Sequence, residues 1–521
     1  MGQILKDLYA FQILLLAVTS LILSTASATP NVSKTNKTDI SQNEISTENI
    51  FCWADYSVVV AMLIISCMIG VFYGYFGEKQ TTGDDFLLGG SSMGTFPMAL
   101  SLGASFITAI ELLGNPAEMY TAGAQFWMIC FAFLLVVPIA SHLYLPVFMR
   151  LRLTSCYEYL EVRFCKSIRV YASALYLMQM LMYTAVAVYA PALALSDVTG
   201  LNTYLAVSLI YLVCIFYASQ GGMKAVIMTD TFQSAVLIGS LGAVLTLGAH
   251  QVGGFKVVLE RAWRSDRLHL FDMNPDPTVR HSFWSVVVGG TVYWSSMFCA
   301  NQASVQKYLS VERIAQVRVA LWVSAFGLIA VYSVNFATGA ILAVHYADCD
   351  PIQAGVISGS DRLLPLFVVQ ELGGARGVPG FFVAGIFAAS LGAKEKRDSS
   401  KGETNEPPDL LANQSIARWV CLVCGAVSFA LVFAVERLGP VLQLALSFNG
   451  MAGGVALGLF SLGMFFPWAS AKGAVAGGAF GLLLVVVAGT GAQLSQVSQP
   501  QLPVSTDGCV VALNITRNVL G

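Results

Sequence analysis

Residues 103–120 read GASFITAIELLGNPAEMY, and this stretch indicates an interrupted membrane helix. It lies in an apolar region, yet it contains Gly114 and Pro116, which weaken the hydrogen-bond ladder of a helix. Interrupted helices of this kind expose backbone carbonyls that can bind a cation near the middle of a membrane. A carboxylate at that depth is costly and indicates a functional site, so Glu111 is a candidate. Glu118 is expected to lie at the membrane interface.

The whole chain has the composition of a protein that crosses the membrane many times. It has 521 residues, of which 56% are hydrophobic and 11% are charged, and its mean hydropathy is +0.69. Soluble domains carry about 25% charged residues, so no single soluble core could bury this many apolar side chains. The 47 glycines suit closely packed membrane helices, and the net charge of −2 indicates no nucleic-acid partner.

About twelve apolar segments predict an all-α polytopic bundle within the lipid bilayer. Most have the roughly 20 residues that a membrane-spanning helix needs, and most connections between them are short. The segment at 379–392 is too short, because a charged, proline-containing stretch follows it. The segments lie at 54–75, 95–118, 122–149, 167–196, 202–219, 223–249, 281–301, 316–346, 379–392, 416–437, 440–466 and 473–492.

The N-terminal region has the features of a secretory signal sequence followed by an extracellular tail. Residues 1–28 resemble a signal peptide, with an apolar run too short to span comfortably and the small-residue cleavage site ASA at 26–28. The alternative is an uncleaved anchor helix. Residues 29–50 form a polar tail with glycosylation acceptors at Asn31 and Asn36, which function only if this tail is extracellular.

If the N-terminus is extracellular, the connections between successive membrane segments lie alternately inside and outside the cell. Lys and Arg are concentrated in most of the connections that this topology places inside, as is typical of membrane proteins. The connection at 250–280 is the exception, because it is extracellular and carries five Lys and Arg residues. The linker at 393–415 is then cytoplasmic, and further membrane helices follow at 416–492. The tail at 493–521, with a glycosylation acceptor at Asn514, is extracellular.

The same topology places Cys349 and Cys509 outside the cell, where oxidising conditions favour a disulfide between them. The alternatives are that each cysteine is free or pairs with Cys52, because connectivity cannot be deduced from sequence. The chain contains no HExxH or Walker A motif, so we do not expect an enzyme.

A second acidic residue lies inside an apolar segment. The stretch GGMKAVIMTDTFQSAVLIG, residues 221–239, places Asp230 about a third of the way into a helix. Two threonines and Gln233 flank it with the oxygen atoms that Na⁺ or a proton relay would use. The alternative is a structural ion pair with Lys224, but a spacing of six residues separates two side chains on a helix surface. We favour a cation-binding or gating role.

A third stretch, VYWSSMFCANQASVQKYL at 292–309, combines Tyr293 and Trp294 with the amides of Asn301 and Gln302. Amide groups beside aromatic rings suit a small polar organic ligand. Hydrogen bonds between helices explain these residues nearly as well.

Together these stretches resemble the sodium/solute symporter family, in particular its animal, insect-type sodium-coupled monocarboxylate and multivitamin transporters. The resemblance covers roughly 51–392 and 416–509. It implies a bundle of two inverted five-helix repeats, with interrupted first and sixth core helices around a central site. The residues that carry it are FLLGGSSMGTFPMALSLGASF (86–106), GNPAEMYTAG (114–123), GGMKAVIMTDTFQ (221–233), VPGFFVAGIFAASL (378–391), LGLFSLGMFFPWASAKGA (457–474) and LPVSTDGC (502–509).

The resemblance implies a main sodium site between the first and eighth core helices. The backbone carbonyls of Ala104, Ile107 and Ala389 would supply ligands. Two neighbouring hydroxyl side chains complete this site in the family, but this chain has Gly392 and Ala393 at those positions. The eighth core helix is also expected to be truncated, because the charged linker begins there.

The resemblance assigns Asp230 to a further cation site and to coupling. It assigns Glu111, Asn301 and Gln302 to the substrate site and inner gate. It implies a plasma-membrane symporter that carries Na⁺ and a small organic solute, similar to a monocarboxylate or a vitamin, by alternating access. The alternative is a non-transporting or sodium-uncoupled isoform that lacks the main sodium-site hydroxyls. A non-transporting isoform would be retained in the secretory pathway or would act on a full-length family member.

Overall fold

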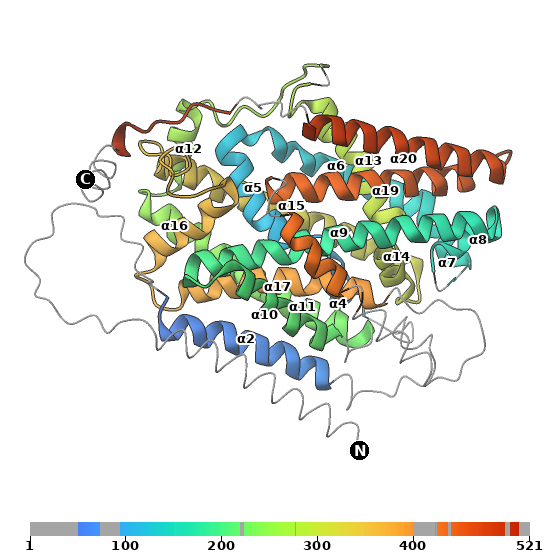
Figure 1. Cartoon of the computed structure of the whole chain (residues 1–521), viewed down its shortest axis with the longest axis horizontal. Helices are drawn as coiled ribbons and strands as arrows, with labels where there is room; N and C mark the ends of the chain where they lie inside the picture. Colours follow the sequence, from blue (N-terminus) through green and yellow to red (C-terminus); the bar gives the residue numbers. More distant parts are fainter. Residues whose placement is uncertain are drawn as a thin grey trace, which may run out of the picture.

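In the computed structural model, all regular elements of the described part of the chain are helices (Figure 1). The predicted segments at 1–28 and 29–50 and the acceptors Asn31, Asn36 and Asn514 lie outside this part. The described residues are 51–72, 94–151, 153, 155–218, 223–276, 278–399, 423, 425–435, 439–494 and 501–509.

The longer helices form one bundle, in which α20, α19, α9 and α2 run roughly parallel to the long axis in Figure 1. The bundle helices are α2 (Trp53–Val71), α4 (Thr95–Ala104), α5 (Ala109–Ala122), α6 (Ile129–Ile139), α7 (Leu145–Leu151), α9 (Lys166–Thr199), α10 (Thr203–Ala218), α11 (Met223–Gln251), α13 (Gly290–Cys299), α14 (Gln302–Leu309), α15 (Ile314–His345), α17 (Val378–Ser399), α19 (Val441–Phe465) and α20 (Ala471–Leu494).

Shorter elements connect or extend these helices. They are η3 (Ala124–Met128), η4 (Ala140–Tyr144), α8 (Glu158–Arg163), α12 (Phe255–Arg264), η5 (Trp284–Gly289), η6 (Ser360–Arg362), α16 (Leu363–Leu372) and η7 (Asp507–Cys509).

By length and composition, six described helical stretches can cross a membrane, and the bent pair α4–α5 makes a seventh. Shorter apolar helices lie at Trp53–Ser66, Val378–Ala389 and Gly425–Val435. Each of the twelve predicted apolar segments contains a described helix. The prediction of an all-α membrane bundle is therefore confirmed.

Helix α17 differs in one respect from the expectation. Its apolar part, Val378–Ala389, is short as predicted, but its backbone stays helical to Ser399 instead of stopping near residue 392. The charged run that follows the apolar part, AKEKR at 393–397, consists of good helix formers, which explains the extension. The side chains of residues 390–399 lie outside the described part of the structure.

Close packing around the first core helix depends on small residues. Helix α15 packs against both α4 and α5, and α11 packs along α17. A Cβ atom at Gly339 of α15 would lie 2.6 Å from the carbonyl oxygen of Pro116 in α5. A side chain there would push the two helices apart, so the glycine permits the contact that holds α5 in place.

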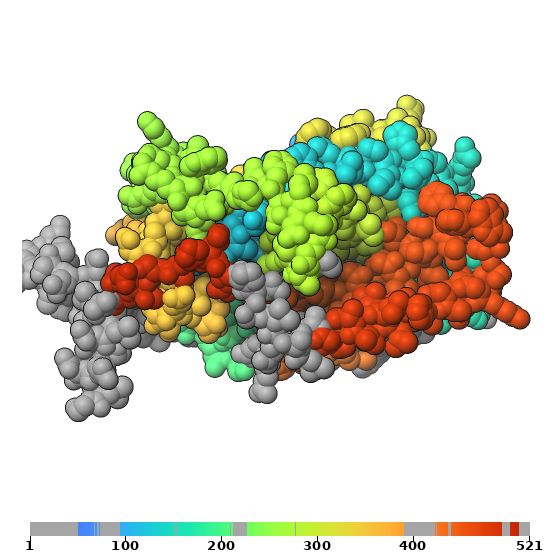
Figure 2. Space-filling model, turned by 90° about the horizontal axis from the view of Figure 1, so that it is seen from above, coloured from blue at the N-terminus to red at the C-terminus, as the bar shows by residue number. Residues whose placement is uncertain are grey.

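The outer end of the bundle, as the predicted topology orients it, is covered by a tail at 501–509. A disulfide joins Cys349 to Cys509. Backbone hydrogen bonds also tie the tail to α5, where Leu502 N–H donates to the carbonyl of Thr121 at 3.0 Å. Figure 2 shows this red segment running between the lime region around α12 and the yellow-orange connection that precedes α17.

Candidate functional site

The first core helix is interrupted between α4 and α5, whose axes differ by 56° across the break at 105–108. Helix α5 restarts at Thr108, whose hydroxyl oxygen accepts the N–H of Ile110 at 3.3 Å. Glu111 closes a capping box, because its Oε2 accepts the N–H of Thr108 at 2.8 Å and the Thr108 hydroxyl at 2.5 Å. The predicted membrane-depth carboxylate therefore also caps the broken helix.

Glu111 lies in a buried, largely aromatic site, with 8% of its surface exposed. Its carboxylate is within electrostatic reach of the hydroxyl groups of Tyr183, Tyr293 and Tyr332. Asn335 of α15 donates from Nδ2 to the backbone carbonyl of Glu111 at 3.4 Å. The site therefore combines one carboxylate with hydroxyl and amide groups at the centre of the bundle.

Two asparagine side chains near Glu111 retain unused hydrogen-bonding atoms within the described part of the chain. The Asn115 amide lies beside the hydroxyl group of Tyr332, which can use only part of its hydrogen-bonding capacity, and Oδ1 of Asn335 is without a partner. Both residues have 0% of their surface exposed. Leaving a buried polar atom unpaired costs about 1–3 kcal/mol, so these atoms are suited to bind a polar ligand.

A second break separates α13 from α14. Asn301 caps α14 by accepting the N–H of Ala303 at 3.0 Å, and Oε1 of Gln302 accepts the N–H of Cys156 at 2.7 Å. Both amides predicted to serve the substrate or the inner gate thus make structural hydrogen bonds at the break. Aromatic rings pack nearby, where Phe106 of the first break stacks on Phe298 near the end of α13 with the ring centroids 4.4 Å apart.

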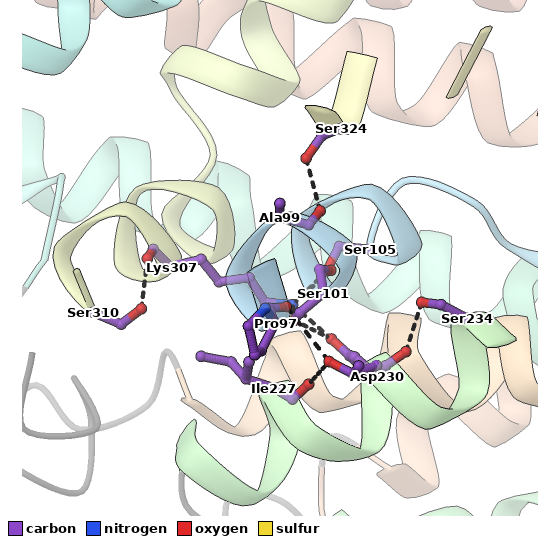
Figure 3. Close-up of polar contacts among 11 residues, drawn as sticks. Pro97, Ala99, Ser101, Ser105, Ile227, Asp230, Ser234, Lys307, Ser310 and Ser324 are labelled. Carbon is purple, nitrogen blue, oxygen red and sulfur yellow. Dashed lines mark hydrogen bonds and ion pairs between the residues drawn. The ribbon is translucent and has the colours of Figure 1, made fainter. Parts of the chain in front are cut away.

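Asp230 of α11 forms a buried ion pair with Lys307 of α14 (Figure 3). The Lys307 Nζ donates to Oδ2 of Asp230 at 2.7 Å, to the Ser101 hydroxyl at 2.5 Å and to the Ser105 hydroxyl at 2.6 Å. Ser101 in turn donates its hydroxyl to Oδ2 of Asp230 at 2.6 Å. This inner cluster of Ser101, Ser105, Asp230 and Lys307 joins the broken helix α4 to α11 and α14.

Oxygen atoms beside this ion pair remain unused in the described part of the protein. The second carboxylate oxygen of Asp230, Oδ1, and both polar atoms of the Gln233 side chain have no hydrogen-bond partner. Asp230 and Gln233 have 0% and 2% of their surface exposed. Carboxylate and amide oxygens are ligands for hard cations, so this side of Asp230 suits the predicted cation role.

The residues that would bind sodium through their backbones lie on elements that meet. Ala104 ends α4, Ile107 lies in the break, and Ala389 lies in α17, which packs against α5. The carbonyl of Ala104 accepts the N–H of Ile107 at 3.2 Å. The side-chain positions of residues 392 and 393, where the hydroxyl pair is missing, lie outside the described part of the structure.

Comparisons with known proteins identify the family of the chain. The sequence profile described as "Sodium:solute symporter family" matches residues 86–393. The chain is 40% identical over 485 residues to sodium-coupled monocarboxylate transporter 2 of Mus musculus, which covers 91% of this chain and 78% of that protein. This chain belongs to the sodium:solute symporter family. The family predicted from sequence is thereby confirmed.

The names of two further relatives refer to different anions. Sodium-coupled monocarboxylate transporter 1 of Homo sapiens is 37% identical over 475 residues, or 89% of this chain and 78% of that protein. The sodium/iodide cotransporter of Homo sapiens is 37% identical over 479 residues, or 89% of this chain and 74% of that protein.

A solved symporter shares the fold. It is a Na⁺-coupled sialic acid symporter in a substrate-bound, outward-open state, which is 25% identical and superposes with a TM-score of 0.73. The alignment covers 86% of this chain and 99% of that one. The family and this likeness identify a multi-pass membrane transporter scaffold.

The outer end of this symporter scaffold carries a second charged cluster, formed by Glu118, Arg280 and His281. Arg280 donates from Nε and Nη2 to the two carboxylate oxygens of Glu118, each at 2.8 Å. Nε2 of His281 lies 2.6 Å from Oε1 of Glu118. The sequence placed Glu118 only at the interface, and its partners 162 and 163 residues away could not be identified from spacing.

A cavity of about 70 Å³ adjoins this outer cluster, between α5, η6 and the start of α19. Asp361 lies in its wall and accepts the N–H of Val441 through Oδ2 at 3.0 Å. Burial raises the pKa of the Asp361 carboxyl, and the negative charge of Glu118 raises it further. The lining residues are Gly114, Ala117, Glu118, Thr121, Ala122, Arg280, Ser360, Asp361, Pro440, Leu442, Gln443 and Gln501.

Proposed function

We propose that this protein is a plasma-membrane, sodium-coupled symporter of small organic solutes, similar to monocarboxylates or vitamins, that works by alternating access. The observation that carries the proposal is the break at 105–108 in the α4–α5 helix, where the buried carboxylate of Glu111 caps the start of α5. Sodium coupling and organic-anion transport are supported by the names of relatives that cover about nine-tenths of the chain.

The sodium ion would bind between the break and α17, with the carbonyls of Ala104, Ile107 and Ala389 as ligands. Such a site needs about six oxygen atoms by analogy with other hard cations, and residues 392 and 393 supply no hydroxyl. We therefore expect weak sodium affinity. Replacing Gly392 by Ser and Ala393 by Thr should strengthen sodium binding by up to about a hundredfold, which corresponds to roughly 3 kcal/mol.

The inner cluster would act as the cytoplasmic gate. The Lys307 ammonium ties α14 to α4 through Ser101 and to α11 through Asp230. An inward-open state requires these helices to separate, so the contacts of Lys307 must be exchanged or hydrated during transport. A cation at the unpaired Oδ1 of Asp230 would weaken the attraction for Lys307 and would couple ion binding to opening.

The test is uptake of radiolabelled propionate and biotin by cells that express the full chain. We expect uptake with Na⁺ in the medium and none when N-methylglucamine replaces it. Surface biotinylation of the same cells measures the fraction at the plasma membrane. Surface-exposed protein without uptake of either compound, with or without Na⁺, would contradict the proposal and favour the non-transporting alternative.

A further inference from the structure

The outer cavity lies one helical turn from Glu111 along the same face of α5. Gly114, Glu118 and Ala122 all line the cavity, and their spacing of four residues places them on one face of the helix. Glu111 lies three residues before Gly114 and therefore continues this face toward the break. A solute that moves inward along this face passes Arg280 before it reaches the central site.

Arg280 is arranged to hold a planar carboxylate at the cavity wall. Its two N–H groups each meet one oxygen of Glu118 at 2.8 Å, which is the bidentate geometry that a guanidinium forms with a carboxylate. The Arg280 side chain keeps 30% of its surface exposed. The Glu118 carboxylate thus marks the position in which the carboxylate of a ligand would bind to Arg280.

His281 supplies Glu118 with a second partner. Its Nε2 lies 2.6 Å from Oε1 of Glu118, and its ring packs on Phe126 with the ring centroids 5.2 Å apart. Glu118 has only 10% of its side chain exposed, so its charge would be costly without a partner. Because His281 remains in place, Arg280 can leave Glu118 without isolating that carboxylate.

We propose that Arg280 forms an outer subsite for the carboxylate group of an incoming solute, which takes the place of Glu118 on the guanidinium. This subsite rests on the proposed transport function, because it names the class of solute that the pathway admits. The neighbouring polar side chains Gln443 and Gln501 line the same cavity and carry no charge that would repel an anion.

Among the described residues that line the cavity, Asp361 and Glu118 carry acidic side chains. Oδ2 of Asp361 is committed to the N–H of Val441, so Asp361 does not compete for Arg280 through that atom. Arg362, the next residue in the chain, offsets part of the negative charge of Asp361.

A thiol-labelling experiment on the full chain tests the subsite without requiring transport. Gln443 is exposed at the cavity, so Gln443→Cys provides a probe for a membrane-impermeant maleimide. The chain without this substitution gives the background from native cysteines. We expect propionate to slow labelling of Gln443→Cys, and propionamide, which has the same shape without the charge, to have no effect.

Matched variants then identify Arg280 as the group that binds. In an Arg280→Gln background, the propionate concentration for half-protection should rise about tenfold or more, because a bidentate charge-assisted contact is lost. Arg280→Lys should give an intermediate value. Glu118→Gln should lower the concentration, because the competing charge is removed while the side chain keeps its size.

Three results would overturn the subsite. They are equal protection in the Arg280→Gln background, protection by iodide as strong as by propionate, and protection by Na⁺ or tetramethylammonium without propionate. The second would show a site for any small anion instead of a carboxylate, and the third a cation site. Sodium-dependent uptake by the unmodified chain is scored separately, so transport without protection rejects only the subsite, and protection without transport rejects only the symporter.

Discussion

The inner and outer charged clusters differ in how much water reaches them. At the inner cluster the side chains of Lys307 and Asp230 are 3% and 0% exposed, whereas at the outer cluster Arg280 and Glu118 are 30% and 10% exposed. A buried ion pair cannot separate unless another group replaces the lost partner, because the isolated charges would be too costly. The inner ion pair is therefore a fixed tie, by which we mean that it separates only when a cation binds or the helices move. The outer ion pair can exchange partners.

The largest effect is expected from breaking the inner tie. Lys307→Met leaves the buried Asp230 carboxylate without its cation, which should lower the free energy of unfolding by about 3–5 kcal/mol. The thermal melting of detergent-solubilised protein, followed by size-exclusion chromatography, measures the loss.

The double variant Asp230→Asn with Lys307→Met is the control. It removes both charges, so it should recover most of the stability while sodium-dependent uptake stays impaired. If Lys307→Met alone melts at the temperature of the unmodified protein, the inner pair does not stabilise the closed bundle. The inner cluster would then not differ from the outer cluster in the way that we infer from burial.

The part of this site that could be predicted from sequence is the part that depends on local pattern. The interrupted span, the depth of Glu111 and the apolar segments are properties of continuous stretches, which length and composition reveal. The position of the break differs from the expectation, because it lies at 105–108, whereas Gly114 and Pro116 are inside the continuous helix α5. The spacing of Thr108 and Glu111 also fits a capping box, a role that the prediction for Glu111 does not include.

The pairs could not be predicted, because they join helices distant in the chain. Lys307 lies 77 residues from Asp230, and Arg280 lies 162 residues from Glu118. No periodicity relates such positions, so their contacts depend on how the two repeats pack. The local alternative for Asp230, an ion pair with Lys224, shows how spacing along one helix misses a partner that another helix supplies.

The second largest effect concerns the tail that covers the outer end. The bond between Cys349 and Cys509 closes a loop of 160 residues, and a native disulfide contributes typically 2–4 kcal/mol to stability. Replacing both cysteines by serine should lower the melting temperature and should speed the labelling of Gln443→Cys, because the tail residue Gln501 also lines the cavity. Unchanged labelling would show that the tail does not control access to the outer cluster.

A smaller effect on stability is expected from removing the outer pair itself. The double variant Glu118→Gln with Arg280→Gln should lower the free energy of unfolding by about 1 kcal/mol or less, because solvent screens a partly exposed pair. Melting of this variant beside the double variant of the inner cluster compares the two regions directly. A loss as large as that of Lys307→Met would show that the outer pair is a fixed tie as well.

The smallest effect is expected from Asp361, and it depends on pH. The folded protein raises the pKa of this carboxyl from its ordinary value of 3.8, mainly through burial and also through the negative charge of Glu118. Arg362 and the N–H of Val441 act in the opposite direction, and Arg280 faces the same cavity.

A raised pKa means that the folded state holds the proton of Asp361 more tightly than the unfolded state does. The resulting stabilisation is present below the unfolded pKa and is lost as pH rises through the folded pKa, so the ionised group destabilises the protein near neutral pH. Asp361→Asn keeps an oxygen that can accept the N–H of Val441 and removes the charge. The variant should melt at a slightly higher temperature than the unmodified protein at pH 7, and the difference should shrink as the pH falls. A difference that grows on acidification would mean that the negative charge of Asp361 stabilises the fold, and the outer cavity would then favour cations over the carboxylate that we assign to it.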